Sequence, residues 1–302
     1  MLNPEDLYEL DDGLPELAGP VLLHSLDGFV DAGSTGQLVR EHILEALEHR
    51  VIARFDVDSL IDYRARRPAM TYDRDHWSAY EAPELVVHLL HDETGSPFLL
   101  LAGPEPDRLW EGFTASVRHL VERLGVRLVV GFHGIPMGVP HTRPVGITSH
   151  ATRPELVTRN SWFDKVQVPG SAAGLMELRL GESGHDALGF AVHVPHYLAQ
   201  SAYPAAAVAA LEAVTGATGL VLPVDRLRDA AERTNTDIAE QVTGNDEVEK
   251  VVQALEQQYD AFAGAAERES LLAESQDMPT ADELAAQFEQ FLAEQDGPDA
   301  QP

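Results

Sequence analysis

Six polar side chains that could exchange protons or bind an anion follow two short apolar segments of the sequence. The segments are residues 21–26 and 128–132, and both have the length and apolar character of buried strands. Imidazoles titrate near neutral pH, carboxylates can serve as bases, and a guanidinium group binds anions through paired donors. We therefore predict a candidate ligand pocket made of Asp27, Asp31, Ser34, His133, His141 and Arg143.

Two loops rich in glycine and proline must position these side chains. The loop at residues 27–36 follows the first segment, and the loop at residues 133–144 follows the second. Proline fixes φ and glycine permits unusual φ, so loops of this composition are stiff. In open α/β sheets ligands usually bind at the carboxyl ends of the strands, which favours a site here. The alternative is a pair of rigid connections whose polar groups only cap one another.

The first loop resembles two catalytic motifs without completing either of them. Residues 28–35 have the glycine spacing of a phosphate-binding P-loop, but Ser34 occupies the position of the required lysine. Residues 32–36 approach the G-x-S-x-G nucleophile elbow, with Ala32 in place of the first glycine. Because a helical pattern begins directly after Ser34, we interpret this residue as the N-cap of a helix.

Histidines are frequent in the middle of the chain, at positions 133, 141, 150, 185, 193 and 196. Three imidazoles can bind a metal ion, but neither an H-E-x-x-H motif nor a regular H-x-H pair occurs among them. We therefore expect no metal and no cofactor. We predict instead a buried hydrogen-bond network in which His193, His196 and Tyr197 support the pocket.

The composition excludes several classes of protein and partner. The 302 residues carry a formal charge of −29, are 44% hydrophobic and include no cysteine. Nucleic acids and anionic membranes both require a basic surface, so neither is an expected partner. The lack of cysteine excludes disulfides and thiol catalysis. No segment resembles a signal peptide or a membrane span, so we expect a soluble cytoplasmic protein.

Strand and helix patterns alternate along the first 222 residues. The expected strands are residues 21–26, 51–57, 85–91, 98–102, 128–132, 146–150 and 187–194. The expected helices are residues 34–47, 106–124, 172–180 and 203–214, and residues 61–83 are predicted to form a long loop or a short hairpin. This alternation predicts an α/β protein, a sandwich around a mixed, largely parallel sheet.

The chain is expected to divide into four parts. These are an N-terminal arm (1–20), an α/β core domain (21–222), an acidic helical C-terminal region (223–295) and a disordered tail (296–302). In the third part we predict two helices that are interrupted at residues 243–245, and a further amphipathic helix within residues 280–295. Residues 229–302 hold 19 acidic and 3 basic side chains, which leaves −16 of the total charge in this quarter of the chain.

Three segments carry a resemblance to a known family. They are DGFVDAGST (27–35), GIPMGVPHTRP (134–144) and GHDALGFAVHVPHYLAQSAYPAAA (184–207). In this order they resemble the proteasome assembly chaperone 2 family, in its bacterial, high-GC branch. The resemblance implies a three-layer α/β/α sandwich, similar to the fold of nucleoside phosphorylases and peptidyl-tRNA hydrolases. It also implies a homo-oligomer, for which we expect a trimer, with proteasome α-subunits as a possible partner.

Two functions from different classes remain open. The resemblance, together with the lack of a complete catalytic motif, favours a non-enzymatic assembly chaperone or scaffold. Several relatives dock through a C-terminal hydrophobic-Tyr-any tripeptide, whereas this sequence ends in Asp299-Ala300-Gln301-Pro302, so we do not expect that route of docking. The alternative is binding of a nucleoside or phosphate-like small molecule, or an enzyme of the hydrolase or phosphorylase type. There Arg143 would hold an anion and a histidine would act as acid or base.

Overall fold

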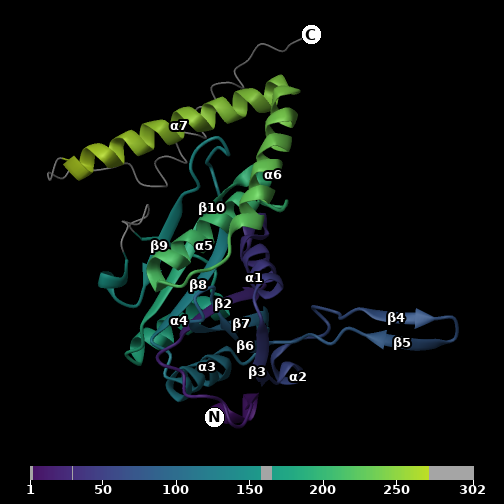
Figure 1. The fold of residues 1–302 in the computed structure, drawn as a ribbon. Coiled ribbons are helices and arrows are strands. Elements are labelled where there is room, and N and C mark those ends of the chain that lie inside the picture. The colour runs from purple at the N-terminus through teal and green to yellow at the C-terminus, as the bar shows by residue number, and fades with distance from the viewer. Residues whose placement is uncertain (1–2, 29, 158–164, 272–302) are drawn as a thin grey trace.

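A mixed sheet of eight strands separates two layers of helices (Figure 1). The computed structural model describes residues 3–28, 30–157 and 165–271. The strands lie in the order β1-β3-β6-β7-β2-β8-β10-β9. Their bounds in that order are Tyr8–Leu10, His49–Phe55, Val86–His91, Pro97–Pro104, Val21–Asp27, Leu128–Met137, Ala187–Pro195 and Ile147–Ala151. The strand β1 thus comes from the segment expected to be an N-terminal arm.

The centre of the sheet is parallel. The strands β7, β2, β8 and β10 pair side by side in parallel, with Leu22 opposite both Leu99 and Val129. The outer pairs, β1–β3, β3–β6, β6–β7 and β10–β9, are antiparallel. Five of the eight strands therefore point in the same direction, and the carboxyl ends of the four central strands meet at one edge. This arrangement confirms the predicted mixed, mainly parallel α/β sheet.

Each face of the sheet is covered by helices. The helices α1 (Thr35–Ala46), α5 (Pro204–Thr218) and α6 (Asp225–Thr243) pack against one face, and α3 (Trp110–Leu124) and α4 (Ala172–Glu182) against the other. Successive side chains of a strand point to opposite faces of the sheet, so each strand contributes apolar residues to the core on both sides. In β2, for example, Val21 and Leu23 face α1 and α5, whereas Leu22 faces α3. The three layers are those that the sequence predicted.

A short connection leads from α3 into the central strand β8. The helix begins at Trp110, four residues later than expected, and Leu109 before it has a left-handed φ of 57°. Gly125 ends the helix with φ 64°, a conformation that favours glycine, as the sequence predicted. The chain then enters β8 at Leu128, which starts a run of five buried residues.

The predicted end of the central strand was wrong. We expected the strand to stop at Phe132, but β8 continues to Met137 and pairs with β10 along its whole second half. Its pairing with β2 ends at Gly131, opposite His24, so one edge of the strand is open beyond that point. Proline has no backbone N–H to donate to a neighbouring strand, so Pro136 is tolerated where this edge of β8 is unpaired. The stiff loop between β8 and β9 is therefore residues 138–146.

A two-stranded hairpin projects from the body of the protein (Figure 1). It consists of β4 (Met70–Asp73) and β5 (His76–Tyr80), and all nine strand residues are exposed. The prediction of a long loop or short hairpin at residues 61–83 is thus resolved in favour of the hairpin. The hairpin joins the body next to the short helix α2 (Val57–Leu60).

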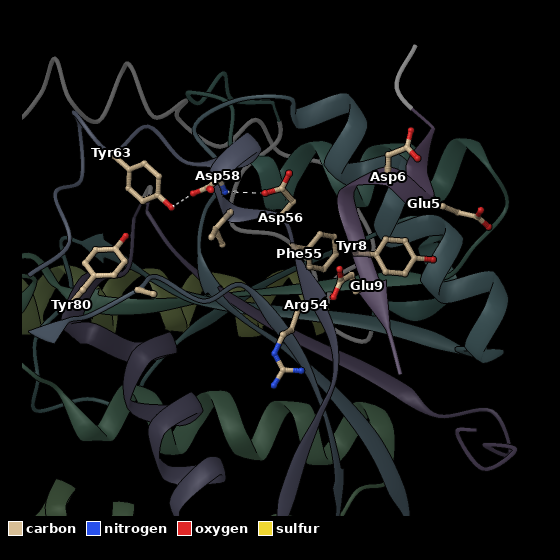
Figure 2. A pocket seen from close by; sticks show the side chains of 12 residues that line it. Glu5, Asp6, Tyr8, Glu9, Arg54, Phe55, Asp56, Asp58, Tyr63 and Tyr80 are labelled. Atoms are coloured by element: carbon tan, nitrogen blue, oxygen red, sulfur yellow. Dashed lines mark hydrogen bonds between the residues drawn. The ribbon is translucent and has the colours of Figure 1, made fainter. Parts of the chain in front are cut away.

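A cavity of about 600 Å³ lies between the base of the hairpin and the N-terminal segment (Figure 2). Tyr63 and Tyr80 stand on one side of it, and Tyr8 on the other. The hydroxyl of Tyr63 donates to Asp58 at 2.5 Å, and this hydrogen bond raises the pKa of the tyrosine. The lining also includes the carboxylates of Glu5, Asp6, Glu9, Asp56 and Asp58, opposed by the single guanidinium of Arg54. The cavity is therefore strongly acidic.

Two long helices follow the sheet. The helix α6 ends at Thr243, and α7 (Asp246–Leu271) begins after a break at residues 244–245, as predicted. The side chain of Asn245 caps α7 by accepting from the N–H groups of Glu247 and Val248. The helix expected within residues 280–295 and the predicted disordered tail lie outside the described residues. In the described part of the chain, no helix is both long and apolar enough to span a bilayer.

We predict that Leu100→Ala lowers the free energy of unfolding by ~2–5 kcal/mol, because it leaves a cavity in the core between the sheet and α1 and α5. Leu100 has no exposed surface. Urea unfolding followed by circular dichroism measures the change. Leu178→Ala is the matched control, because Leu178 is 56% exposed, and its effect should stay within ~0.5 kcal/mol. Equal effects of the two substitutions would contradict the assigned core.

Candidate functional site

Asp31 fixes the loop after β2 against the neighbouring strand β8. Its Oδ1 accepts from the N–H of Gly36 at 2.8 Å and from the N–H of Gly134 at 3.0 Å. Its Oδ2 accepts from the N–H of Gln37 at 3.0 Å. One carboxylate therefore satisfies two donors in the first turn of α1 and one in β8. Because it accepts these three backbone hydrogen bonds, the side chain of Asp31 is held in a fixed position.

Ser34 occupies the N-cap position of α1, but its side chain makes no capping hydrogen bond. The expected capping role was wrong in this respect, since Asp31 accepts from the first turn instead. The preceding Gly33 has φ 68°, and its N–H donates to the carbonyl of Ala199 at 2.9 Å. A Cβ at Gly33 would lie 3.0 Å from the Cβ of Tyr203, so a side chain would also collide there. The tight turn is thus explained by packing against the start of α5.

Asp27, at the end of β2, forms an ion pair with Arg40 of α1. The Nη1 of Arg40 lies 2.7 Å from Oδ1 of Asp27, and the arginine side chain is only 12% exposed. The same Nη1 reaches the carbonyl of Ser25 at 3.4 Å. The carboxylate of Asp27 is therefore engaged in holding α1 against the sheet.

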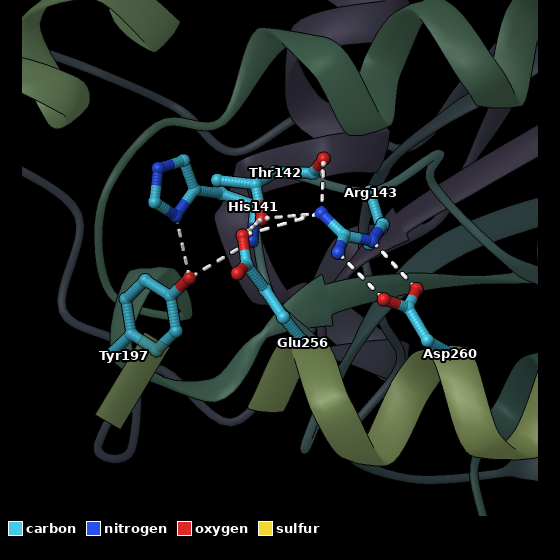
Figure 3. Close-up of polar contacts among 6 residues, drawn as sticks. All are labelled: His141, Thr142, Arg143, Tyr197, Glu256 and Asp260. Carbon is cyan, nitrogen blue, oxygen red and sulfur yellow. Dashed lines mark hydrogen bonds and ion pairs between the residues drawn. The ribbon is translucent and has the colours of Figure 1, made fainter. Parts of the chain in front are cut away.

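His141 and Tyr197 connect the β8–β9 loop to the turn after β10 (Figure 3). The hydroxyl of Tyr197 accepts from the backbone N–H of His141 at 2.9 Å and lies 2.7 Å from Nδ1 of the same residue. Burial lowers the pKa of His141 and raises that of Tyr197, so both groups are neutral at pH 7. The ring of His196 packs edge to face on Tyr197, with centroids 5.4 Å apart. Two members of the predicted supporting network, His196 and Tyr197, thus lie together.

Arg143 joins the same loop to α7 (Figure 3). Its Nε and Nη2 each lie 2.7 Å from one carboxylate oxygen of Asp260, a bidentate pair, and its Nη1 lies 3.3 Å from Glu256. The hydrogen bond to Asp260 raises the pKa of Arg143, and the pKa of Asp260 is lowered in turn. Thr142 donates to Glu256, and Tyr259 donates to a loop carbonyl at 3.3 Å. One turn of α7 therefore binds this loop.

His133 points to the other face of the sheet, toward α4. Its neighbours Phe132 and Val130 face α1 and α5, so alternation along the strand turns His133 away from them. Burial lowers the pKa of His133, and the nearby charge of His150 lowers it further. The contacts of the six predicted pocket residues thus sort them into three sets. Asp27 and Asp31 brace α1 and Ser34 stands at its N-cap position, His141 and Arg143 bind Tyr197 and α7, and His133 faces α4.

Several polar residues around His133 escaped the sequence analysis. His24 lies in the buried run of β2, and Glu177 of α4 binds Nδ1 of His150 at 2.9 Å. The predicted network residue His193 lies on the same face, where its Nε2 is 2.8 Å from Thr148. The only sequence signal was the odd placement of His24 in an apolar strand. Among the described residues, no group of side chains is arranged to hold a metal ion.

The fold and the loop at the carboxyl edge of its sheet together define a class of protein. A three-layer α/β/α sandwich carries a stiff loop at the carboxyl edge of its central strands, and a C-terminal helix packs on that loop. The chain belongs to the PAC2 family, whose model matches residues 25–242. The family predicted from the three sequence segments is confirmed, and so is its bacterial, high-GC branch.

Solved structures extend this comparison. The chain is 48% identical to a Mycobacterium tuberculosis protein of unknown function, over 89% of this chain and 94% of that one, with a TM-score of 0.83. A Corynebacterium glutamicum protein of unknown function is 38% identical over 85% and 98% of the two chains, with a TM-score of 0.81. A Mycobacterium tuberculosis proteasome-assembly chaperone homologue shares the fold at 22% identity, over 77% and 99%, with a TM-score of 0.70. No curated protein matches the chain.

We predict that His24 makes the fold sensitive to acid. Burial lowers its pKa from 6.5 to about 3, so the unfolded chain binds this proton first as the pH falls. Stability from this group is complete above pH 6.5 and decreases toward pH 3, by about 1.4 kcal/mol per pH unit. His24→Gln should therefore flatten the decrease that urea unfolding detects in this range. His76→Gln, at an exposed hairpin residue, should leave the slope unchanged. A slope unaltered by His24→Gln would contradict the assignment.

We predict that the pair between Arg143 and Asp260 holds α7 on the loop. Arg143→Asp should increase hydrogen exchange at residues 246–261, because it places two carboxylates side by side, while exchange in the sheet stays constant. Mass spectrometry of peptides measures both regions. Asp260→Arg in the same chain should restore protection, and Gln257→Ala, an exposed change on the same helix, should have no effect. Equal exchange in all variants would show that the pair does not hold the helix.

Proposed function

We propose that this protein is a non-enzymatic assembly factor, a cytoplasmic homo-oligomer that binds other proteins while a larger particle assembles. Membership of the PAC2 family supports the proposal, as does the fold shared with a protein named as a proteasome-assembly chaperone homologue. The partner class that follows from this relationship is the α-subunit of a proteasome.

The observation that carries the proposal is the exposed hairpin of β4 and β5. Met70, Tyr72, Trp77 and Tyr80 each expose between 51% and 63% of their surface. The rings of Tyr72 and Trp77 meet edge to face with centroids 5.2 Å apart. An isolated two-stranded ribbon is marginally stable in water, and aromatic residues are enriched at protein interfaces. An arm of this kind is suited to binding a protein surface.

The hairpin also suggests how copies of the chain associate. Arg74, between the two strands, exposes 93% of its side chain. The cavity at the hairpin base is lined by Asp6, Glu9 and Asp58, to which the guanidinium of Arg74 is complementary, although Asp73 and Asp75 on either side of it leave the turn without a net positive charge. A contact between two different surfaces of identical chains closes into a ring when the rotation permits. This pairing gives a cyclic oligomer, for which a trimer is the expected size.

The helices α6 and α7 offer a second surface for partners. The first turn of α7 holds Asp246, Glu247 and Glu249, and the exposed Val248 and Val251 lie beside them. Acidic faces repel one another and attract basic surfaces, so this one suits a partner other than a second copy. In the proposed role it either contacts the client subunit or shields the oligomer from further association.

The alternative, a small-molecule pocket or an enzyme built from the six predicted residues, has less support. Asp27 is paired with Arg40, Asp31 accepts three backbone hydrogen bonds, and Arg143 is held by Asp260. A ligand would have to displace these partners before the side chains could bind it. The bonds of these residues therefore favour the structural interpretation of the two loops.

We predict that the protein forms a ring through its hairpin. Light scattering after size exclusion should give the mass of an oligomer for the natural chain. Trp77→Ser combined with Tyr72→Ser should give a monomer with unchanged circular dichroism, because both residues are exposed on the hairpin and neither belongs to the core. Leu178→Ser alters an equally exposed apolar side chain on α4 and should not change the mass. A monomeric natural chain would exclude the proposed ring.

We further predict that proteasome α-subunits from the same cell co-purify with the tagged full chain. Under the proposal, the natural chain retains α-subunits and the Trp77→Ser, Tyr72→Ser double variant retains fewer. Mature 20S particles retained in place of free α-subunits would indicate an activator or an adaptor, and would contradict a role in assembly. Retention of no proteasome subunit at all would remove the proposed partner class.

A further inference from the structure

A row of four residues crosses the centre of the sheet on the face covered by α4. The strand registers place His24 opposite Gly131, Gly131 opposite Gly189, and Gly189 opposite His150. The row therefore spans β2, β8, β10 and β9, with an imidazole at each end and two glycines between. Glycine is unfavourable inside a strand, so two in one row indicate a need for space.

The two glycines provide room for the imidazoles. A Cβ at Gly131 would lie 2.5 Å from Nε2 of His24, and a Cβ at Gly189 would lie 2.5 Å from Nε2 of His150. Each ring therefore lies over the neighbouring glycine and extends from its end of the row toward the centre. The glycines are explained by these rings, because any side chain at either position would displace an imidazole.

A third imidazole lies one row further along the same face. His133 follows Gly131 by two residues, and its neighbours across the sheet are Ala191 and Thr148, both small. Exposure increases across the group, from 8% for His24 to 48% for the side chain of His150, with His133 half-buried. The three rings therefore lie on one face of the sheet, with His24 the most buried of them and His150 the most exposed.

The hydrogen bonds in this group are incomplete. Glu177 binds Nδ1 of His150, and this bond, acting against burial, raises the pKa of His150 while leaving its Nε2 uncommitted. No hydrogen bond joins the ring of His24 to another described residue, and its nitrogens are not among the fully enclosed polar atoms, so they remain accessible. A ring that is buried as a whole but keeps accessible nitrogens can donate to a small ligand.

The charged groups near the three rings determine which ligand fits. Glu177 is paired with His150, and Asp31 accepts three backbone N–H groups. His193 on β10 is bonded to Thr148. The carboxylates are thus occupied, whereas the imidazoles retain N–H groups that they can donate. Hydrogen bonds from an imidazolium to an oxyanion are charge-assisted and strong.

We propose that His24, His133 and His150 form a binding site for a small oxyanion of the phosphate type, bound through imidazole N–H groups with uptake of a proton. The site is separate from His141, Arg143 and α7, which meet at the β8–β9 loop, and it does not depend on the proposed assembly role.

Proton uptake follows from the state of the free site. Burial lowers the pKa values of His24 and His133, so both rings are neutral at pH 7, and an added anion would favour their protonated forms. Asp31 and Glu177 act in the same direction on His133 by raising its pKa. If one proton is taken up, the affinity for the anion rises about tenfold for each unit by which the pH falls toward the pKa of His133.

Isothermal titration calorimetry of inorganic phosphate into the full chain tests the site. Runs at about pH 6 and about pH 7 should differ roughly tenfold in affinity. Runs in two buffers of different ionisation enthalpy should give an uptake of one proton. A nucleoside monophosphate in a second series distinguishes free phosphate from a phosphoryl group on a larger molecule. Under the proposal, at least one of the two probes binds with this pH dependence.

Variants locate the binding. His133→Gln, at a half-buried position that should not impair folding, is expected to weaken the affinity by about tenfold or more, as for one lost charge-assisted hydrogen bond. Gly189→Ala should also weaken it, because the new methyl group displaces the ring of His150. His141→Gln, on the β8–β9 loop, is the matched control and should bind like the natural chain. Affinity that is independent of pH and unchanged in His133→Gln would overturn the proposal. Zinc binding to the same histidines without an anion would also overturn it.

Discussion

The parallel pairing of β2 with β8 is the constraint on which the rest of the structure depends. It places Val21 beside Leu128 and thereby sets the level of every other central strand. The pairing stops at Gly131, and beyond it β8 is held on one edge by β10 and on the other by Asp31, whose carboxylate binds the N–H of Gly134 as well as the first turn of α1. A charged acceptor with three backbone donors is strongly stabilised, so loop, helix and strand are fixed together. The polar groups of both faces take their positions from this junction.

The two faces of the sheet use their polar residues differently. On the side of α1 and α7, acids and bases are matched in pairs, as Asp27 is with Arg40 and Asp260 with Arg143. Exposed pairs of this kind contribute little stability individually and more when several act on one segment. On the side of α4, imidazoles lie in a largely apolar layer where an unmatched charge would be costly. The first arrangement suits holding elements together, and the second suits a response to ligand or pH.

The sequence was informative wherever a local pattern decides the structure. Apolar runs identified the central strands, and Gly125 and Pro204 marked helix boundaries because their backbone geometry restricts where they occur. It was misleading at Pro136, which resembles a loop residue but lies in a strand with one open edge. Contacts between distant residues were invisible. Arg143 and Asp260 are separated by 117 positions, and the row from His24 to His150 exists only through three strand registers. A single sequence contains no measure of register, so the group of histidines that faces α4 could not be predicted.

The order of strands has a consequence for how the chain emerges from the ribosome. The second strand made, β2, lies in the middle of the finished sheet and has to wait for Pro97–Pro104 and Leu128–Met137 before either of its edges is paired. Its apolar faces stay uncovered on one side until Ala206 and its neighbours in α5 have been synthesised. Topologies dominated by such distant parallel pairs fold slowly and expose strand edges in the meantime. This chain is therefore expected to be among those that need protection while nascent.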